Sequence, residues 1–333
     1  MDLSGLHCLV TGGAGFVGSH VVDRLVAMGN EVTIVDNFST GERANIQHHA
    51  DNPRVHVIEE DVRDMRAMLE ATQGVDVVLH MAVACVRASI NDPLHVHDVN
   101  ATGTLVPCQA SLENGVRRFV YVSSTEVYGN ARYAPVDEEH PLHPTNAYGA
   151  SKAAGEMYAL SAWRTHGLPA CVVRLFNVYG PREHCQGVPA EVIPRFVMRV
   201  LAGESPVIFG TGQQTRDFTW VDDTVSGLVG AAACDALVGD IVHLGRGREV
   251  SVLDLAHLVL DKLGREDLSP VFLEDGRPGD VDHLWADTRK AERLFGYRPS
   301  VDIEDGLDRY IAWVREHGPE PLEWVQQQAL RNW

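Results

Sequence analysis

Two residues whose side chains could move a proton lie four positions apart in the sequence. They are Tyr148 and Lys152, within the alanine- and glycine-rich stretch AYGASKAAGE. Side chains at positions i and i+4 share one face of a helix, so the phenol and the ammonium would be neighbours. The ammonium would favour the phenolate and lower the pKa of Tyr148 from about 10 towards neutrality. By itself, the pair is equally consistent with two polar residues at the edge of a packed helix.

A hydroxyl that could complete this group ends the apolar run RRFVYVSS at residues 117–124. It belongs to Ser124, at the end of an expected strand. Together, the three side chains could take the proton from an alcohol while a hydride leaves the alcohol's carbon for a nicotinamide. This chemistry requires a dinucleotide-binding site elsewhere in the chain.

A glycine-rich turn near the N-terminus has the spacing of such a site. The segment CLVTGGAGFVGSHVVDRL places glycines directly after an expected strand at residues 7–11 and at the start of an expected helix. Glycines let the backbone approach a pyrophosphate, and the helix N-terminus offers free N–H groups. The residues expected to line this turn are Gly12, Gly15, Phe16, Val17 and Gly18. The alternative is a similar turn in a Rossmann relative that binds no nucleotide.

An acidic residue at the end of the second expected strand favours NAD as the cofactor. Asp36 ends the run EVTIVD, where a carboxylate can accept hydrogen bonds from the adenosine ribose. The nearest arginine, Arg43, does not follow directly, which disfavours the 2′-phosphate of NADP. The other residues expected to contact NAD are Asn37, Ser39, Thr40, Asp61, Val62 and Ala82, together with Tyr148 and Lys152.

The alternation of strand and helix patterns predicts the fold. Apolar, β-rich runs occur at residues 7–11, 31–36, 55–61, 75–81, 117–124 and 170–177. Near-continuous apolar strands separated by helices indicate a parallel sheet covered on both faces. We therefore expect an α/β protein with a doubly wound Rossmann sheet over residues 1–180. Residues 181–333 are less regular and predict a smaller mixed α/β region that binds the substrate, with some return of the chain to the Rossmann domain.

The composition disfavours several functional classes. The 333 residues carry a formal net charge of −18, which would repel a nucleic-acid backbone. Six scattered cysteines form no C-x-x-C motif, so we expect no metal site and a reducing, cytoplasmic location. The sequence has no stretch long enough for a membrane span and no basic leader. These features predict a protein with a small-molecule substrate and neither nucleic-acid nor membrane partners.

Motifs along almost the whole chain resemble those of one family. They are TGGAGFVGSH, VDNFSTG, DVRD, SSTEVYG, YGASK, RLFNVYGPR, QTRDFTWVDD and RPGDVDHLWADTRKAERLFGY. The chain resembles the extended short-chain dehydrogenase/reductases, specifically the NAD-dependent epimerase/dehydratase family, and within it the UDP-glucose, UDP-hexosamine and UDP-uronate 4-epimerases. The resemblance implies an isomerase that oxidises C4 of a UDP sugar, lets the 4-keto intermediate rotate and returns the hydride to its other face.

The resemblance also implies roles for individual residues. Tyr148 would be the base, Lys152 would modulate its pKa and hold the nicotinamide ribose, and Ser124 would shuttle the proton. The residues that would bind the substrate are Ser124, Asn177, Val192, Arg216, Arg277 and Asp280. The two arginines would clamp the diphosphate. A homodimer is implied as well, paired through helices near residues 92–115 and 147–166.

Two places depart from the epimerase pattern. The segment HMAVACVR at residues 80–87 is slightly shorter than the usual loop and lacks its polar Gln or Ser. Glu126 stands where simple epimerases have Thr or Ser, whereas 4,6-dehydratases have a glutamate there and pair it with an aspartate that is Thr125 in this chain. With Thr125 at that position, the acid that would protonate a leaving hydroxyl is missing. Thr125 is instead a candidate for a second proton-shuttling hydroxyl beside Ser124, and Glu126 has a catalytic and an equal structural interpretation. Arg182 is expected to bind the carboxylate of a UDP-uronate.

Three functions remain open at this level. The leading hypothesis is an NAD-dependent nucleotide-sugar 4-epimerase. A UDP-glucuronate decarboxylase or an NDP-sugar 4,6-dehydratase would use the same 4-keto intermediate. A non-catalytic NAD-binding sensor would keep the glycine turn but would not need the tyrosine, lysine and serine together.

Overall fold

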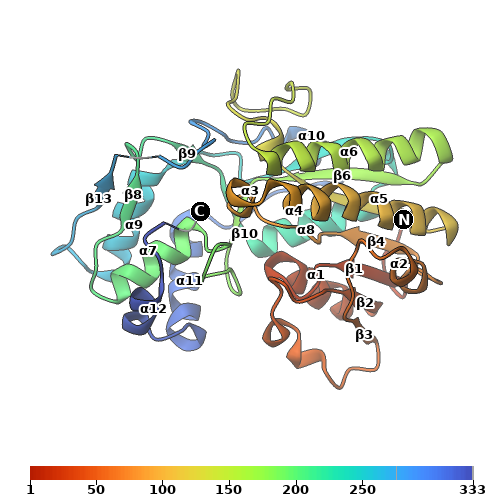
Figure 1. Ribbon diagram of the computed structural model, residues 1–333, viewed down its shortest axis with the longest axis horizontal. Coiled ribbons are helices and arrows are strands. Elements are labelled where there is room, and N and C mark those ends of the chain that lie inside the picture. Colours follow the sequence, from red (N-terminus) through yellow and green to blue (C-terminus); the bar gives the residue numbers. More distant parts are fainter. Residues whose placement is uncertain (275, 332–333) are drawn as a thin grey trace.

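The computed structural model describes residues 1–274 and 276–331 and contains a seven-stranded parallel sheet (Figure 1). The strands lie in the order β3-β2-β1-β4-β5-β6-β11. Their bounds are β1 (His7–Thr11), β2 (Glu31–Val35), β3 (Val55–Ile58), β4 (Val77–His80), β5 (Arg118–Ser124), β6 (Ala170–Leu175) and β11 (Ile241–Leu244). The predicted doubly wound α/β sheet is confirmed, and β11 is an additional strand that the sequence analysis missed.

Helices cover both faces of this sheet (Figure 1). Helices α5 and α6 pack on one face with α2 beside them, and α1, α8 and α10 pack on the other. Their bounds are α1 (Phe16–Ala27), α2 (Met65–Ala71), α5 (Gly103–Glu113), α6 (Ala147–His166), α8 (Val221–Ala233) and α10 (Arg289–Phe295). Two short helices and a π-helical turn lead into α5, namely α3 (Ala88–Asn91), α4 (Pro93–His97) and Asp98–Thr102.

A second region lies beside the carboxyl ends of the strands, on the left in Figure 1. Its helices are α7 (Val192–Leu201), α9 (Val252–Leu263), α11 (Ile303–His317) and α12 (Pro321–Gln327). Three two-stranded sheets pair β7 (Asn177–Tyr179) with β10 (Phe218–Trp220), β9 (Thr215–Arg216) with β12 (Val250–Ser251), and β8 (Val207–Phe209) with β13 (Val271–Leu273). Strand β11 comes from the second half of the chain yet belongs to the main sheet, and α8, also from that half, packs against the sheet. The boundary at residue 180 stays a prediction.

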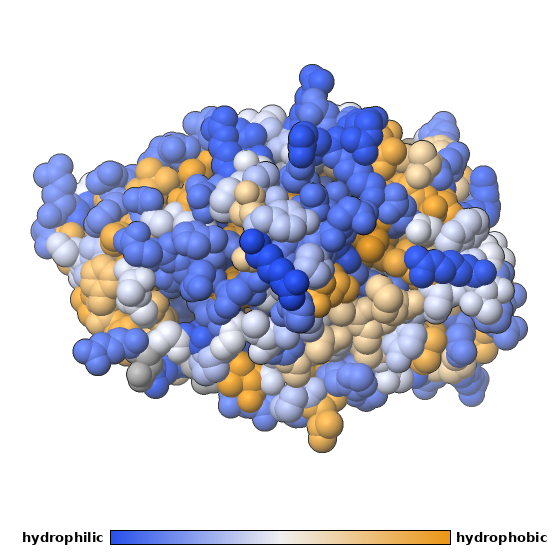
Figure 2. Space-filling view, turned by 90° about the horizontal axis from the view of Figure 1, so that it is seen from above, coloured by the Kyte–Doolittle hydropathy of each residue, from blue (hydrophilic) through white to orange (hydrophobic). Residues whose placement is uncertain are grey.

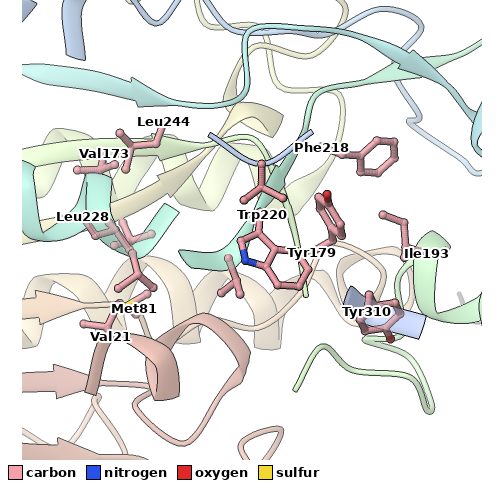
Figure 3. Close-up of a cluster of buried hydrophobic side chains, with 14 of the residues drawn as sticks. Val21, Met81, Val173, Tyr179, Ile193, Phe218, Trp220, Leu228, Leu244 and Tyr310 are labelled. Carbon is pink, nitrogen blue, oxygen red and sulfur yellow. The ribbon is translucent and has the colours of Figure 1, made fainter. Parts of the chain in front are cut away.

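One apolar core continues from the main sheet into the second region. Leu244 on β11 belongs to the same buried cluster as Ile193 on α7 and Tyr310 on α11 (Figure 3). Between them, the rings of Tyr179 and Trp220 meet edge to face with centroids 5.4 Å apart. Because close-packed interiors resist deformation, this shared core holds the main sheet and the second region in one relative position.

The surface is mixed in character. On the face shown in Figure 2, hydrophilic residues predominate and hydrophobic residues form separate patches. Within the described part of the chain, no helix combines the length and the apolar character that crossing a membrane requires. The six cysteines, all of which lie in that part, are free thiols.

A buried ion pair anchors α6 to the sheet. Arg174 on β6 donates from Nε and Nη2 to the carboxylate of Glu156 on α6, at 2.8 and 2.6 Å, and the two side chains are 2% and 0% exposed. The hydroxyl of Ser123 on β5 donates to the same carboxylate at 2.6 Å. Buried charges are tolerated when such partners satisfy them. The pair therefore holds α6 against β5 and β6, one helical turn beyond Lys152.

We expect Glu156→Ala to lower the free energy of unfolding by roughly 3–5 kcal/mol, because Arg174 is left buried without its carboxylate. Urea denaturation followed by circular dichroism measures this loss. The control is Glu70→Ala, which removes an exposed pair with Arg66 on α2 and should change stability by less than about 0.5 kcal/mol. Equal losses in the two variants would contradict the anchoring role of the buried pair.

Candidate active site

A cavity of about 500 Å³ lies at the carboxyl ends of the parallel strands. Strands β2 and β3 lie on one side of β1, and β4 to β6 lie on the other. The loops after β1 and β4 therefore diverge, and a doubly wound sheet binds its ligands in the crevice at this point. The volume is in the range of small-molecule and cofactor sites.

The turn after β1 requires glycine at two positions. Gly12 has a φ of +70°, and a Cβ there would lie 2.9 Å from the backbone of Ala82, which follows β4. A Cβ on Gly18 would lie 2.1 Å from the carbonyl oxygen of Gly12. The absence of side chains lets α1 begin directly against the turn, so its first residues line the cavity with their unpaired N–H groups.

Asp36 occupies the position that the sequence predicted for it. Its two carboxylate oxygens accept hydrogen bonds from the N–H groups of Ala14 and Phe38, both at 2.9 Å. These bonds hold the carboxylate at the edge of the glycine turn. The predicted cofactor residues that line the cavity are Gly12, Gly15, Phe16, Val17, Gly18, Asp36, Asn37, Ser39, Thr40, Asp61, Val62, Ala82, Tyr148 and Lys152. Their placement agrees with the expectation, and their contacts with NAD stay predictions.

The local sequence explains how α6 brings Tyr148 and Lys152 to the cavity. Asn146 caps the helix, because its side-chain oxygen accepts the N–H of Gly149 at 2.8 Å. A Cβ on Gly149 would lie 2.3 Å from the carbonyl oxygen of Glu126. This glycine therefore lets the start of α6 lie directly against the turn after β5, where the third reactive group is found.

The expected effect of Lys152 on the pKa of Tyr148 is wrong for this structure. The Nζ of Lys152 donates to the carbonyl oxygen of Val122 at 2.7 Å. Burial lowers the pKa of Lys152 to about 7, and the charge of Glu156 opposes this change. Burial also raises the pKa of Tyr148 above its usual range, and a hydrogen bond with Ser124 offsets part of the rise. Desolvation therefore outweighs the helical proximity of the two groups.

Glu126 has partners on both of its carboxylate oxygens. Oε2 accepts the side-chain amide of Asn146 at 2.9 Å, and Oε1 lies 3.5 Å from Nη2 of Arg277. Thr125 is buried in the 3₁₀ turn after β5. Of the three consecutive candidates, Ser124 is the one among the described lining residues of the cavity. This placement supports the structural interpretation of Glu126.

The two arginines predicted to clamp a diphosphate lie together. Arg216 and Arg277 donate through Nη2 to the same oxygen of Asp280, at 2.5 and 2.6 Å. Arg216 also donates to the carbonyl oxygens of Thr215 and Val281, which fixes its guanidinium. A second cavity of about 310 Å³ has Asp280 and Val281 in its wall. The predicted convergence of the two cations therefore occurs, and their contact with a substrate stays a prediction.

Arg182 lies elsewhere than expected. Its Nη2 pairs with a carboxylate oxygen of Asp23 on α1 at 2.8 Å, and it is not among the described residues that line the cavity. The guanidinium that was expected to bind the carboxylate of a uronate is thus paired with a residue of α1 instead. Asn177, the first residue of β7, lines the cavity as predicted. Val192 opens α7 outside the lining, although its neighbour Glu191 belongs to it.

Asp23 also belongs to the one group of described side chains whose possible ligand atoms lie close enough together to hold a metal ion. The Nε2 atoms of His48 and His49 both lie 2.7 Å from Oδ1 of Asp23. Because Arg182 already pairs with the other oxygen, the carboxylate has a cationic partner without a metal ion. The expectation of no metal site stays a prediction.

Sequence reasoning missed three polar residues that belong to one arrangement beside the cavity, namely Arg87, Asn100 and Glu191, of which Glu191 lines it. Arg87 follows β4, and its two Nη atoms donate to the two carboxylate oxygens of Glu191 at 2.8 and 2.9 Å. Asn100 in the π-helical turn bonds both the N–H and the carbonyl oxygen of Ala84, at 2.8 and 3.1 Å, and so fixes the loop that carries Arg87. Arg87 and Glu191 are 104 positions apart, so no local pattern connects them.

The chain contains three lysines, so NMR of lysine-labelled protein can follow Lys152. We expect its ammonium to lose its proton near pH 7, because burial disfavours the charged form. Lys152 is then charged below this pH and neutral above it. Lys152→Arg assigns the signal by its disappearance. A midpoint near the usual value of about 10.4 would contradict the expectation.

The sequence matches one group of enzymes. The profile of a family described as GDP-mannose 4,6 dehydratase matches residues 9–310. The chain is 36% identical to a provisionally named UDP-glucose 4-epimerase of Methanocaldococcus jannaschii, over 93% of this chain and 98% of the relative.

Solved structures of such enzymes share the fold. The dTDP-glucose 4,6-dehydratase of Streptomyces venezuelae, with NAD and TYD bound, has a TM-score of 0.87 at 35% identity and covers 94% of this chain and 98% of its own. The UDP-glucose 4-epimerase of Thermotoga maritima, with UDP-glucose, has a TM-score of 0.87 at 34% identity and covers 93% and 99%. The fold, the glycine turn and the side chains gathered at the cavity thus have a common explanation, which is that this chain belongs to the NAD-dependent epimerase/dehydratase family.

Proposed function

We propose that this protein is a nucleotide-sugar 4-epimerase that uses NAD and acts on a UDP sugar. Membership of the family supports an NAD-dependent enzyme of nucleotide sugars. The observation that favours epimerisation over dehydration is the engagement of Glu126 by Asn146 and Arg277.

The residues at the cavity fit NAD. Gly12 and Gly18 leave the backbone open where a pyrophosphate approaches. Asp36 uses one bond on each oxygen, and a carboxylate has about four acceptor positions, so it can also accept the ribose hydroxyls. NAD, when bound, supplies reversible hydride transfer.

Tyr148 and Lys152 together would handle the proton of the sugar hydroxyl. At neutral pH the raised pKa of Tyr148 keeps the phenol uncharged, and the lowered pKa of Lys152, about 7, leaves a large share of its amine uncharged. Transfer of the phenolic proton to the amine creates a phenolate beside an ammonium without changing the net charge of the buried pair. The phenolate then takes the C4 hydroxyl proton, and Ser124, already bonded to Tyr148, provides the second hydroxyl of the path.

Glu126 argues against the dehydratase alternative. Elimination of a hydroxyl requires an acid that protonates the leaving oxygen. Both carboxylate oxygens of Glu126 already have partners, Asn146 and Arg277, and Glu126 is not among the described residues that line the cavity. Thr125, its neighbour, supplies no carboxylate in its place. The decarboxylase is the second candidate function, because it too starts with oxidation at C4.

Product analysis with two variants tests this proposal. Protein with NAD is incubated with UDP-glucose, UDP-N-acetylglucosamine and UDP-glucuronate, and the products are identified by NMR. Tyr148→Phe should lower kcat by about 10²–10⁴-fold and keep NAD bound, because it removes the proton acceptor and leaves the glycine turn unchanged. Glu126→Gln should lower kcat by less than about tenfold, since it weakens charge-assisted hydrogen bonds outside the cavity.

The products separate the alternatives. The C4 epimer supports the proposal, whereas carbon dioxide release or a 6-deoxy-4-keto sugar rejects it. A loss of activity in Glu126→Gln as large as that in Tyr148→Phe would make Glu126 a catalytic acid. If none of the three sugars reacts, the protein is not an enzyme for these substrates.

We also propose a homodimer that pairs the outer faces of α5 and α6. Leu105 on α5 and Met157 on α6 are 37% and 46% exposed, which supports an apolar contact there. Met157→Glu should shift the sedimentation mass from dimer to monomer, because it buries a charge in the interface. Leu322→Glu on α12, at a residue 57% exposed, is the matched control and should remain dimeric. A monomeric unmodified protein would reject the proposal.

A further inference from the structure

An ion pair borders the main cavity, and one of its two residues, Glu191, lines the cavity. Arg87, in the loop after β4, is 8% exposed, and both of its Nη atoms donate to Glu191 at the start of α7. Glu191 lines the cavity, together with Cys85 from the same loop as Arg87. The positive charge of Arg87 is therefore neutralised by a carboxylate that lies in the cavity wall.

The surroundings of the reactive tyrosine are negative in character. Burial is the main cause of the raised pKa of Tyr148, and the charges of Glu126 and Glu191 add to it. Glu183 also lines the cavity and is 4% exposed, and it accepts the N–H of Gly180 at 3.2 Å. Burial and the charge of Glu191 raise the pKa of Glu183 well above its usual range.

Free cations are scarce at this cavity. Among the described residues in its wall, Lys152 is the only lysine or arginine, and its Nζ is bonded to the carbonyl oxygen of Val122. Arg182, which the sequence suggested for a sugar carboxylate, pairs with Asp23 instead. A carboxylate on the sugar would thus enter a buried site whose described lining contains no arginine and no free lysine to receive it, and a buried unpaired charge is strongly unfavourable.

We propose that the pair of Arg87 and Glu191 determines the substrate class, so that nucleotide sugars with an uncharged hexose or N-acetylhexosamine are accepted and uronates are rejected. The inference rests on the proposed function, because that function places the sugar beside Tyr148. Glu191 is the specificity-determining residue, since it neutralises Arg87 and is the residue of the pair that lines the cavity.

The test compares UDP-glucose with UDP-glucuronate on protein saturated with NAD. We expect kcat/KM for UDP-glucose to exceed that for UDP-glucuronate by at least about 100-fold, because like charges brought together in a buried site cost several kcal/mol. Isothermal titration calorimetry of the same two ligands gives the preference in binding, whatever the chemical step. Comparable values for both sugars in both measurements would overturn the inference.

Two variants test whether the preference for UDP-glucose over UDP-glucuronate depends on the pair of Arg87 and Glu191. Glu191→Gln keeps the size of the side chain but releases the charge of Arg87, so the ratio of kcat/KM values should move towards UDP-glucuronate by about tenfold or more. The double variant Arg87→Met with Glu191→Leu removes both charges without leaving one unpaired. It should retain the preference for UDP-glucose, and circular dichroism checks that it folds. An unchanged ratio in Glu191→Gln would overturn the role of the pair.

The two proposals fail in different ways. Epimerisation of UDP-glucuronate as fast as UDP-glucose would reject the specificity and leave the 4-epimerase intact. A 6-deoxy-4-keto product from UDP-glucose would reject the 4-epimerase and leave the specificity for uncharged sugars intact. Release of carbon dioxide from UDP-glucuronate by the unmodified protein would reject both.

Discussion

The geometry of the site depends on one buried interaction, the ion pair between Glu156 on α6 and Arg174 on β6. Lys152 lies one helical turn before Glu156 and Tyr148 two turns before it, so all three share one face of α6. The bonds from Arg174 and Ser123 fix that face against the sheet. A helix placed by apolar contacts alone can slide or rotate slightly, whereas a bidentate pair has one geometry. The positions of the phenol and the amine relative to the cavity follow from that geometry.

Burial also determines the electrostatics of the site. The phenol and the amine both have pKa values shifted towards their neutral forms, because desolvation exceeds every attraction available to them. The charged residues near the cavity are engaged elsewhere: Arg277 with Asp280, and Arg87 with Glu191. The protein thus presents a site with few unpaired charges to its ligands. Charge developed during a reaction would then interact strongly with a small number of fixed groups.

The sequence predicted those features that depend on local order along the chain. Continuous apolar runs indicated six strands, and glycine spacing located the turn at Gly12 to Gly18. It could not locate β11, because four residues in a region of mixed pattern carry too little periodicity. It assigned Arg182 to the substrate, whereas the fold places Asp23 of α1 beside that guanidinium. Helical spacing correctly made Tyr148 and Lys152 neighbours but contained no information on their desolvation. Such contacts depend on residues distant in sequence, which a single chain does not reveal.

The strand β11 has a consequence for how this chain is synthesised. Residues 241–244 pair with β6 and form the last strand of the main sheet. As the chain leaves the ribosome, one edge of β6 therefore stays unpaired until about 70 further residues have emerged. At the usual rates of translation this takes several seconds. An unpaired strand edge is a template for association with other chains. The order of synthesis thus leaves the nascent sheet exposed to misassembly for longer than a fold whose strands all lie in its first half.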